Sequence, residues 1–281
     1  MNGKNTQSKN FVVVFAVFER RFFLYTTLLN LGGIMKNKEY EFYESVKNWD
    51  FSMINYEEEF FTNWNMFDVL KKYSKNGSRI LDLGTGGGEK VLEFFPNNVE
   101  ILGTDFSSAM IETANFNLKK SGRKNIKFRV MDNYKMDTEL EYYDIVVARN
   151  TCIDPKQIYK TLKKNGVLIV RGVDKLDCWQ LKRMFGMGQE YKDKMPTSLI
   201  DYENILNASF KNVELIPLYV KEYYKSKDDL LALLYKVPIL DYFDTNKDKI
   251  DMDLINKYIL ENTCEKGILL RRRYYGIIAY K

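Results

Sequence analysis

The chain has 281 residues, enough to bury one large hydrophobic core, and 45% hydrophobic with 29% charged residues is typical of a folded domain. It contains no histidine, which excludes Ser–His and Cys–His nucleophiles and histidine metal sites. The net charge of +5 is dispersed and the three cysteines form no CxxC pair, which argues against a nucleic-acid patch, a zinc site and a disulfide framework.

The first 34 residues hold two largely apolar runs, residues 11–18 and 22–31, separated by three charged side chains. Charges at the centre of a membrane-spanning helix are costly, and no small-residue cleavage site follows the first run. We therefore expect residues 1–34 to be an extension that precedes a functional protein beginning at Met35. A peripheral membrane anchor within residues 11–31 and a signal or spanning segment are the alternatives.

The next segment is rich in large aromatic side chains. Between residues 36 and 75 they recur at spacings of three and four, which predicts amphipathic helix. This spacing is compatible with ordinary core packing and also with a lid over a ligand. We interpret residues 36–77 as an N-terminal helical lid on a domain that covers residues 35–281.

From Ser78 onward, short apolar strands alternate with helices. The predicted strands and helices are 79–83, 91–95 (helix), 99–104, 107–121 (helix), 126–130, 143–148, 155–162 (helix) and 167–171. Continuous apolar strands that alternate with helices predict a parallel sheet covered on both faces.

After Gly172 this regularity ends. Residues 174–196 are polar and predicted to be irregular, and later elements are a helix at 198–210, a strand at 213–220, helices at 227–235 and 251–260, and a last strand at 273–280. We predict an α/β fold with a Rossmann-like, seven-stranded, mostly parallel sheet whose last strand is antiparallel. Helical cap insertions are expected at about 173–197 and 221–268.

The strongest functional signal is the glycine-rich turn Asp82-Leu83-Gly84-Thr85-Gly86-Gly87-Gly88, which runs from a strand into a helix. Glycine permits positive φ and removes the Cβ atoms that would keep a ligand away from the backbone. Asp105 ends the second strand, where a carboxylate can accept hydrogen bonds from both hydroxyls of a ribose. The nicotinamide fingerprint would need glycine at the position of Glu89.

Five motifs in chain order resemble those of class I S-adenosylmethionine-dependent methyltransferases. They are the glycine-rich turn, Gly103-Thr104-Asp105-Phe106-Ser107-Ser108-Ala109-Met110, Val130-Met131-Asp132-Asn133, Tyr143-Asp144-Ile145-Val146-Val147-Ala148 and Leu162-Lys163-Lys164-Asn165-Gly166-Val167-Leu168. The resemblance covers residues 78–171 well. It implies S-adenosylmethionine as cofactor and methyl transfer (EC 2.1.1.-).

The resemblance also implies a set of cofactor-binding residues by position. Asp105 would hold the ribose hydroxyls, and Asp82 would lie near the amino group of the cofactor. Phe106 and Met110 would pack on the adenine, and Asp132 would accept from its exocyclic amine. The complete set is Asp82, Gly84, Thr85, Gly86, Gly88, Asp105, Phe106, Met110, Asp132, Asn133 and Arg149.

Residues after the fourth strand are the candidates for catalysis. Arg149 and Asn150 would face the methyl group and the acceptor, and Asp154 is a candidate general base, with Tyr159 and Tyr191 as further candidates. A methyl sulfonium is already activated, so positioning of the nucleophile is the main requirement and a base is optional for a thiol or a neutral amine.

The acceptor class follows from what the loop after the fourth strand lacks. It lacks the Asn/Asp-Pro-Pro-Tyr pattern typical of methyltransferases that act on amino groups of nucleic acids and on protein glutamine. It also lacks the Pro-Cys nucleophile typical of cytosine-C5 methyltransferases. Because no proline precedes Cys152, we interpret it as a buried thiol. We predict a small-molecule acceptor, no metal, no nucleic-acid partner and a cytoplasmic location. An RNA-directed methyltransferase and a non-enzymatic S-adenosylmethionine-binding protein are the alternatives.

Overall fold

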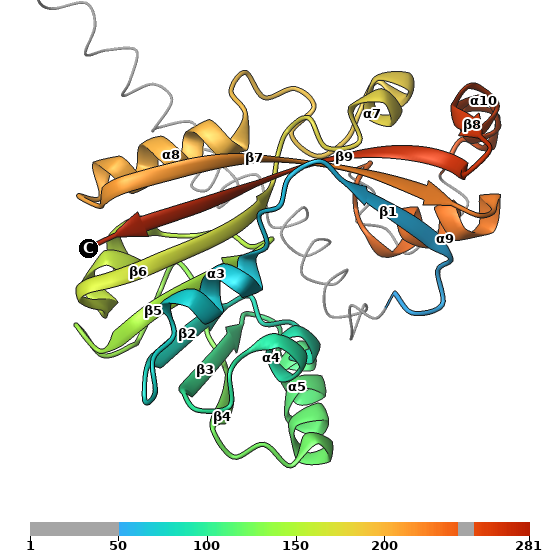
Figure 1. Ribbon diagram of the computed structural model, residues 1–281. Helices are drawn as coiled ribbons and strands as arrows, with labels where there is room; N and C mark the ends of the chain where they lie inside the picture. Colours follow the sequence, from blue (N-terminus) through green and yellow to red (C-terminus); the bar gives the residue numbers. More distant parts are fainter. Residues whose placement is uncertain (1–50, 241–249) are drawn as a thin grey trace, which may run out of the picture. The chain divides into compact units, whose positions relative to one another are not determined.

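The computed structural model describes residues 51–240 and 250–281 (Figure 1). The predicted extension over residues 1–34 lies outside the described residues, as does the part of the predicted lid that precedes residue 51. No helix in the described ranges is both long and apolar enough to cross a bilayer. The predicted cytoplasmic location stays a prediction.

The described residues form one mixed β-sheet with helices on both faces. Its strands are β1 (Tyr56–Phe60), β2 (Arg79–Leu83), β3 (Glu100–Asp105), β4 (Ile126–Val130), β5 (Tyr143–Arg149), β6 (Leu162–Val173), β7 (Lys211–Tyr224), β8 (Thr263–Cys264) and β9 (Gly267–Tyr280). The order across the sheet is β1-β7-β9-β6-β5-β2-β3-β4, and β8 pairs only with β9 (Figure 1).

Strand direction agrees with the sequence-based prediction. The neighbours from β4 to β6 run parallel, and β9 lies antiparallel between β6 and β7. The Rossmann-like sheet with an antiparallel last strand is therefore confirmed. Two strands, β1 and β8, are added to the seven that were predicted.

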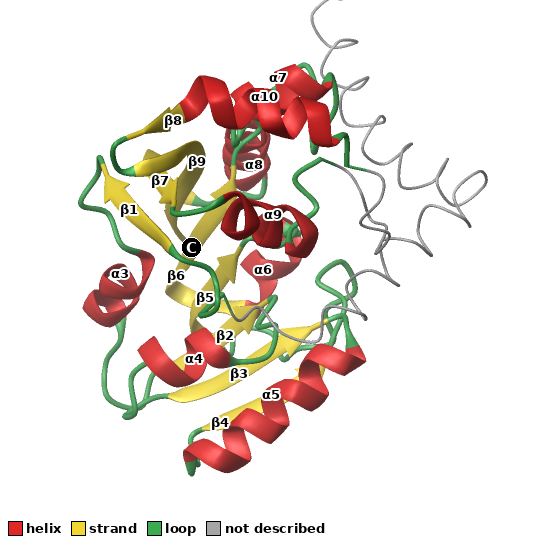
Figure 2. Ribbon diagram, turned by 90° about the vertical axis from the view of Figure 1, so that its right-hand side faces the viewer, coloured by secondary structure: helices red, strands yellow, loops and turns green. Residues whose placement is uncertain are grey.

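Helices cover the two faces of the sheet in separate groups. They are α3 (Met66–Tyr73), α4 (Glu89–Phe94), α5 (Ser108–Ser121), α6 (Pro155–Thr161), α7 (Trp179–Phe185), α8 (Thr197–Asn207), α9 (Lys227–Lys236) and α10 (Met252–Asn262). The core on one face contains side chains of α3, α4 and α5, and the core on the other face contains those of α6 and α8. A third cluster joins α7, α9 and α10, of which α7 and α10 lie side by side in Figure 2.

The central strands are apolar on both sides because both faces are covered. In β5, Ile145 and Val147 belong to the core under α3–α5, whereas Val146 and Ala148 belong to the core under α6 and α8. This explains the near-continuous apolar runs that predicted a parallel sheet.

One local prediction was wrong. Residues 56–60 lie in the segment predicted as a helical lid, but they form β1, which pairs antiparallel with β7 and stacks the Tyr56 ring on Tyr224 at 5.3 Å between centroids. There packing against a distant segment decided the structure, and local spacing did not. The polar segment 174–196 contains α7, within the range where a helical cap insertion was predicted.

Candidate active site

The glycine-rich turn lies between the end of β2 and the start of α4, at the carboxyl edge of the parallel strands. Gly84, Gly86 and Gly88 have φ angles of +71°, +58° and +77°, in the left-handed region that favours glycine. A Cβ atom at Gly84 would lie 2.6 Å from the Thr151 side chain, and one at Gly88 would lie 2.8 Å from the Phe128 ring. The turn therefore requires glycine for its backbone conformation and for space.

Asp105, at the end of β3, holds this turn in place. Its Oδ2 accepts a hydrogen bond from the Gly86 N–H at 2.9 Å, and its Oδ1 accepts one from the Ser107 N–H at 3.0 Å. A carboxylate can accept about four hydrogen bonds, so these two donors do not by themselves exhaust it. The structure thus brings the predicted diol-binding carboxylate next to the predicted glycine turn.

The two hydrophobic residues predicted for the adenine differ in exposure. Phe106 is 44% exposed, whereas Met110 is only 2% exposed. Met110 lies in the first turn of α5, where its N–H donates to the Ser107 hydroxyl that caps the helix. Phe106 therefore has surface to offer a ligand and Met110 has very little.

The loop after β4 is tied to the loop after β5. The Asn133 amide donates to the Thr151 hydroxyl at 3.1 Å and to the Cys152 carbonyl at 2.9 Å. Its buried Oδ1 accepts no hydrogen bond in the part of the chain that the structure describes. The neighbouring Asp132 carboxylate accepts from the Tyr134 N–H at 2.8 Å. This loop can therefore accept hydrogen bonds from an amine.

Asp82 and Arg149 form the electrostatic centre of the site. Burial raises the pKa of Asp82 to about 7, against the opposing effects of the Thr85 hydroxyl and the Arg149 guanidinium. Burial and the nearby Arg171 charge lower the pKa of Arg149. Asp82 pairs with Val147, two residues before Arg149 on the adjacent strand, so the two side chains leave the same face of the sheet.

The other predicted catalytic residues have structural roles. Asn150 has a φ of +53°, and its Oδ1 accepts a hydrogen bond from Arg171 at 2.8 Å. The Asp154 carboxylate caps α6 by accepting from the backbone N–H groups of Lys156 and Gln157. Its proposed role as a base therefore competes with its role as a cap.

The remaining candidates lie among aromatic neighbours or at the surface. Tyr159 packs against the Phe210 ring at 5.2 Å, and Tyr191 packs against the Trp179 ring at 5.2 Å. Cys152 is exposed, so its interpretation as a buried thiol was wrong. It belongs to the loop that follows β5 and not to the apolar strand itself.

Arg171 is the residue that the sequence analysis missed. It pairs in register with Arg149 on the neighbouring parallel strand, and its guanidinium lies 3.9 Å from the centroid of the Tyr274 ring. Two arginines at the carboxyl ends of consecutive parallel strands were visible in the sequence. Within the described ranges, no group of three or more Cys, Asp or Glu side chains could hold a metal ion.

Comparison with known proteins shows that the chain is similar to methyltransferase domains. A family model described as a methyltransferase domain matches residues 74–229, more than half of the chain. The chain is 25% identical over 213 residues to carboxy-S-adenosyl-L-methionine synthase of Nautilia profundicola, covering 64% of this chain and 90% of that protein. It is 28% identical over 149 residues to EEF1A lysine methyltransferase 2 of Danio rerio, covering 46% of this chain and 62% of that protein, less than two thirds of its length.

A solved structure shows the same fold. The YcgJ protein of Bacillus subtilis aligns with 77% of this chain and 97% of its own, with a TM-score of 0.51 and 15% sequence identity. At this identity the likeness supports the fold alone.

Proposed function

This chain belongs to the class I S-adenosylmethionine-dependent methyltransferases, and from that premise we propose that its acceptor is a small molecule. When bound, the cofactor supplies a methyl group on a positively charged sulfur. The observation that carries the assignment is the glycine turn, in which Gly84 and Gly86 adopt positive φ, held by the Asp105 carboxylate at the carboxyl edge of β2 and β3.

The residues present fit this cofactor. We propose that Asp105 accepts from the ribose hydroxyls and that Phe106 packs on the adenine face. The buried Oδ1 of Asn133, which accepts nothing in the described part of the chain, suits the exocyclic amine of the adenine. Asp132 stays in the proposal as a second acceptor, and Met110 stays as an adenine neighbour with little exposed surface.

Around the methyl group, we propose that this chain acts mainly by positioning the acceptor. Arg149 ends β5 and Asn150 follows it, next to the glycine turn, and both can orient a polar acceptor. Orientation of a reacting pair can contribute several kcal/mol, about 7–11 in the most favourable cases. Recruiting Asp154 as a base would sacrifice a helix cap worth about 0.5–2 kcal/mol, so a role in fixing the start of α6 is the simpler one.

The run Arg271-Arg272-Arg273, the most basic in the sequence, supports a small acceptor over RNA. Arg272 is buried between Asp177 and Glu222, with N–O distances of 2.9 and 3.0 Å. Its neighbour Arg273 is exposed and leaves the opposite face of the strand, over the Tyr219 ring. This run therefore does not form the continuous basic surface that RNA binding requires.

The test is methyl transfer from labelled cofactor into three fractions: a small-molecule extract, total RNA and total protein. We expect label in the small-molecule fraction and none above background with the Asp105→Ala variant. Label in RNA, or in protein as the name of the Danio rerio relative suggests for that enzyme, would overturn the proposed acceptor class. Cofactor binding with no transfer into any fraction would favour the non-enzymatic alternative.

A further inference from the structure

Two arginines lie side by side at the carboxyl edge of the sheet. Arg149 on β5 and Arg171 on β6 are register partners on parallel strands, so their side chains leave the same face of the sheet. Asp82 leaves this face as well, one strand away from Arg149. Both arginines are half-buried.

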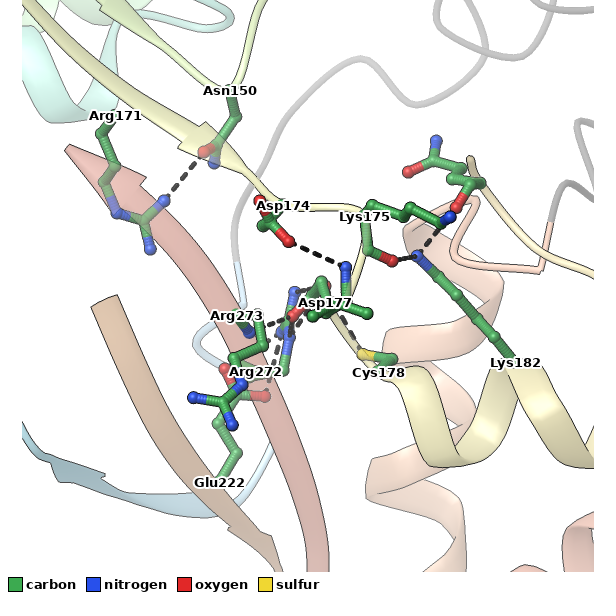
Figure 3. Close-up of polar contacts among 12 residues, drawn as sticks. Asn150, Arg171, Asp174, Lys175, Asp177, Cys178, Lys182, Glu222, Arg272 and Arg273 are labelled. Carbon is green, nitrogen blue, oxygen red and sulfur yellow. Dashed lines mark hydrogen bonds and ion pairs between the residues drawn. The ribbon is translucent and has the colours of Figure 1, made fainter. Parts of the chain in front are cut away.

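Neutral groups hold Arg171 in one orientation. Its Nη1 donates to Asn150 Oδ1 at 2.8 Å, as Figure 3 shows, and its guanidinium lies 3.9 Å from the centroid of the buried Tyr274 ring. A stacked guanidinium with one nitrogen fixed presents its remaining N–H donors in a defined plane. Arg171 is thus oriented without being neutralised.

Arg272, a third arginine near the same tyrosine, provides an internal comparison. Its guanidinium binds the Asp177 carboxylate, with Nε–Oδ1 at 2.9 Å, and the Glu222 carboxylate, with Nη1–Oε1 at 3.0 Å (Figure 3). The Tyr224 hydroxyl in turn donates to Glu222 at 2.6 Å. Here the fold supplies two carboxylates for one buried arginine.

Arg149 and Arg171 differ sharply from this arrangement. Neither forms a salt bridge with any carboxylate in the part of the chain that the structure describes. Carboxyl groups that interact with them at longer range include Asp82 and Glu89 for Arg149, and Glu58 for Arg171. Burial raises the pKa of Asp82 to about 7, so that carboxyl is an incomplete counter-charge. Two adjacent, partly desolvated cations without a bound carboxylate are costly to maintain unless a ligand supplies the anion.

We propose that Arg149 and Arg171 form a subsite for an oxyanion, a carboxylate or a phosphate, carried by the methyl acceptor. Paired planar guanidinium groups match the geometry of both anions. This inference rests on the proposed function and narrows its acceptor class to a small acid.

The cofactor itself carries a carboxylate, so an anion at this subsite could come from the cofactor or from the methyl acceptor, and the two must be distinguished. Arg149 lies beside Asp82 and the glycine turn, within reach of either anion. Arg171 lies one strand further away, and two strand spacings place β6 about 10 Å from β2. Arg171 is therefore assigned to the acceptor and is the residue to test.

The experiment measures anion binding to the full chain saturated with S-adenosylhomocysteine. Benzoate and inorganic phosphate are the probes, titrated by calorimetry. We expect the wild-type chain to bind at least one probe, and Arg171→Gln to weaken that binding tenfold or more while S-adenosylhomocysteine affinity stays within twofold. Arg171→Lys keeps the charge without the planar fork and should give an intermediate loss.

Arg273→Gln is the matched control. Arg273 stacks on the Tyr219 ring at 3.8 Å, nearly the distance of Arg171 from Tyr274, but leaves the opposite face of the sheet. Arg273→Gln should change neither the affinity for the anion probes nor the affinity for S-adenosylhomocysteine. Thermal unfolding of each variant checks that the fold is intact, and Arg171→Lys serves if Arg171→Gln is unstable.

Three results would overturn the inference. The first is a wild-type chain that binds neither probe. The second is a pair of Arg171 variants that bind the probes as tightly as the wild type does. The third is a tenfold loss of S-adenosylhomocysteine affinity in Arg171→Gln, which would assign the arginine pair to the cofactor carboxylate. A wild-type chain that does not bind S-adenosylhomocysteine would instead contradict the proposed function.

Discussion

Replacing Gly84 by alanine tests whether the glycine turn is required for its backbone conformation, for space, or for both. Gly84 has a φ of +71°, and a left-handed conformation costs a residue with a Cβ atom about 1–2 kcal/mol. The new Cβ would also lie 2.6 Å from Thr151 Cβ and 2.8 Å from Thr151 Oγ1, and such overpacking costs about 1–3 kcal/mol. We expect Gly84→Ala to lower the free energy of unfolding by about 2–5 kcal/mol.

Gly122→Ala separates the two effects. Gly122 has a φ of +69°, but a Cβ atom there would meet nothing within 4 Å. Denaturant unfolding of both variants should therefore differ by the overpacking cost alone, about 1–3 kcal/mol. Calorimetry should show weaker S-adenosylhomocysteine binding for Gly84→Ala only, because the backbone of the turn must shift. Equal losses of stability in the two variants, with unchanged affinity in both, would refute the argument from space.

Three further predictions concern charged groups. Asp105→Ala should weaken S-adenosylhomocysteine binding by about 1.5–3 kcal/mol for each hydrogen bond lost to the ribose, as measured by calorimetry, whereas Asp137→Ala at an exposed ion pair should leave the affinity unchanged. Burial raises the pKa of Asp82 to about 7 from an ordinary value of 3.8. Between pH 3.8 and about 7 the folded state therefore binds more protons than the unfolded state. The free energy of unfolding should fall as pH rises through this range, by about 4 kcal/mol at most. Urea unfolding of Asp82→Asn from pH 4 to 8 should show a flatter profile than the wild type, and identical profiles would contradict the assignment. Arg272→Ala leaves Asp177 and Glu222 buried without a counter-charge and should lower the free energy of unfolding by about 3–5 kcal/mol, measured with denaturant. The exposed Arg273→Ala should lower it by less than about 0.5 kcal/mol. Similar losses for the two variants would contradict the stabilising role of Arg272 between the two carboxylates.

The sequence alone was sufficient for the parts of the fold that depend on local patterns. The apolar runs at residues 79–83, 143–148 and 167–171 predicted parallel strands because each strand is buried on both faces. The glycine turn and Asp105 were both predicted at the ends of consecutive strands. The structure joins them by the hydrogen bond from the Gly86 N–H to the Asp105 carboxylate.

Only the tertiary structure could decide how segments distant in the chain meet. Residues 56–60 form a strand because β7 offers an edge to pair with, and nothing local in Tyr-Glu-Glu-Glu-Phe specifies that partner. The bond from Asn133 to the loop after β5 likewise joins two segments whose contact no spacing encodes.

The arginines show the same division most clearly. Arg149, Arg171 and Arg272 carry the same charge in the sequence, yet Arg272 binds two buried carboxylates and the other two lie together without a salt bridge in the described part of the chain. The sequence determines that charge is present. Strand register and burial determine which charges are neutralised and which are left to bind a ligand, because the energy of an ion pair depends on distance and on access to water.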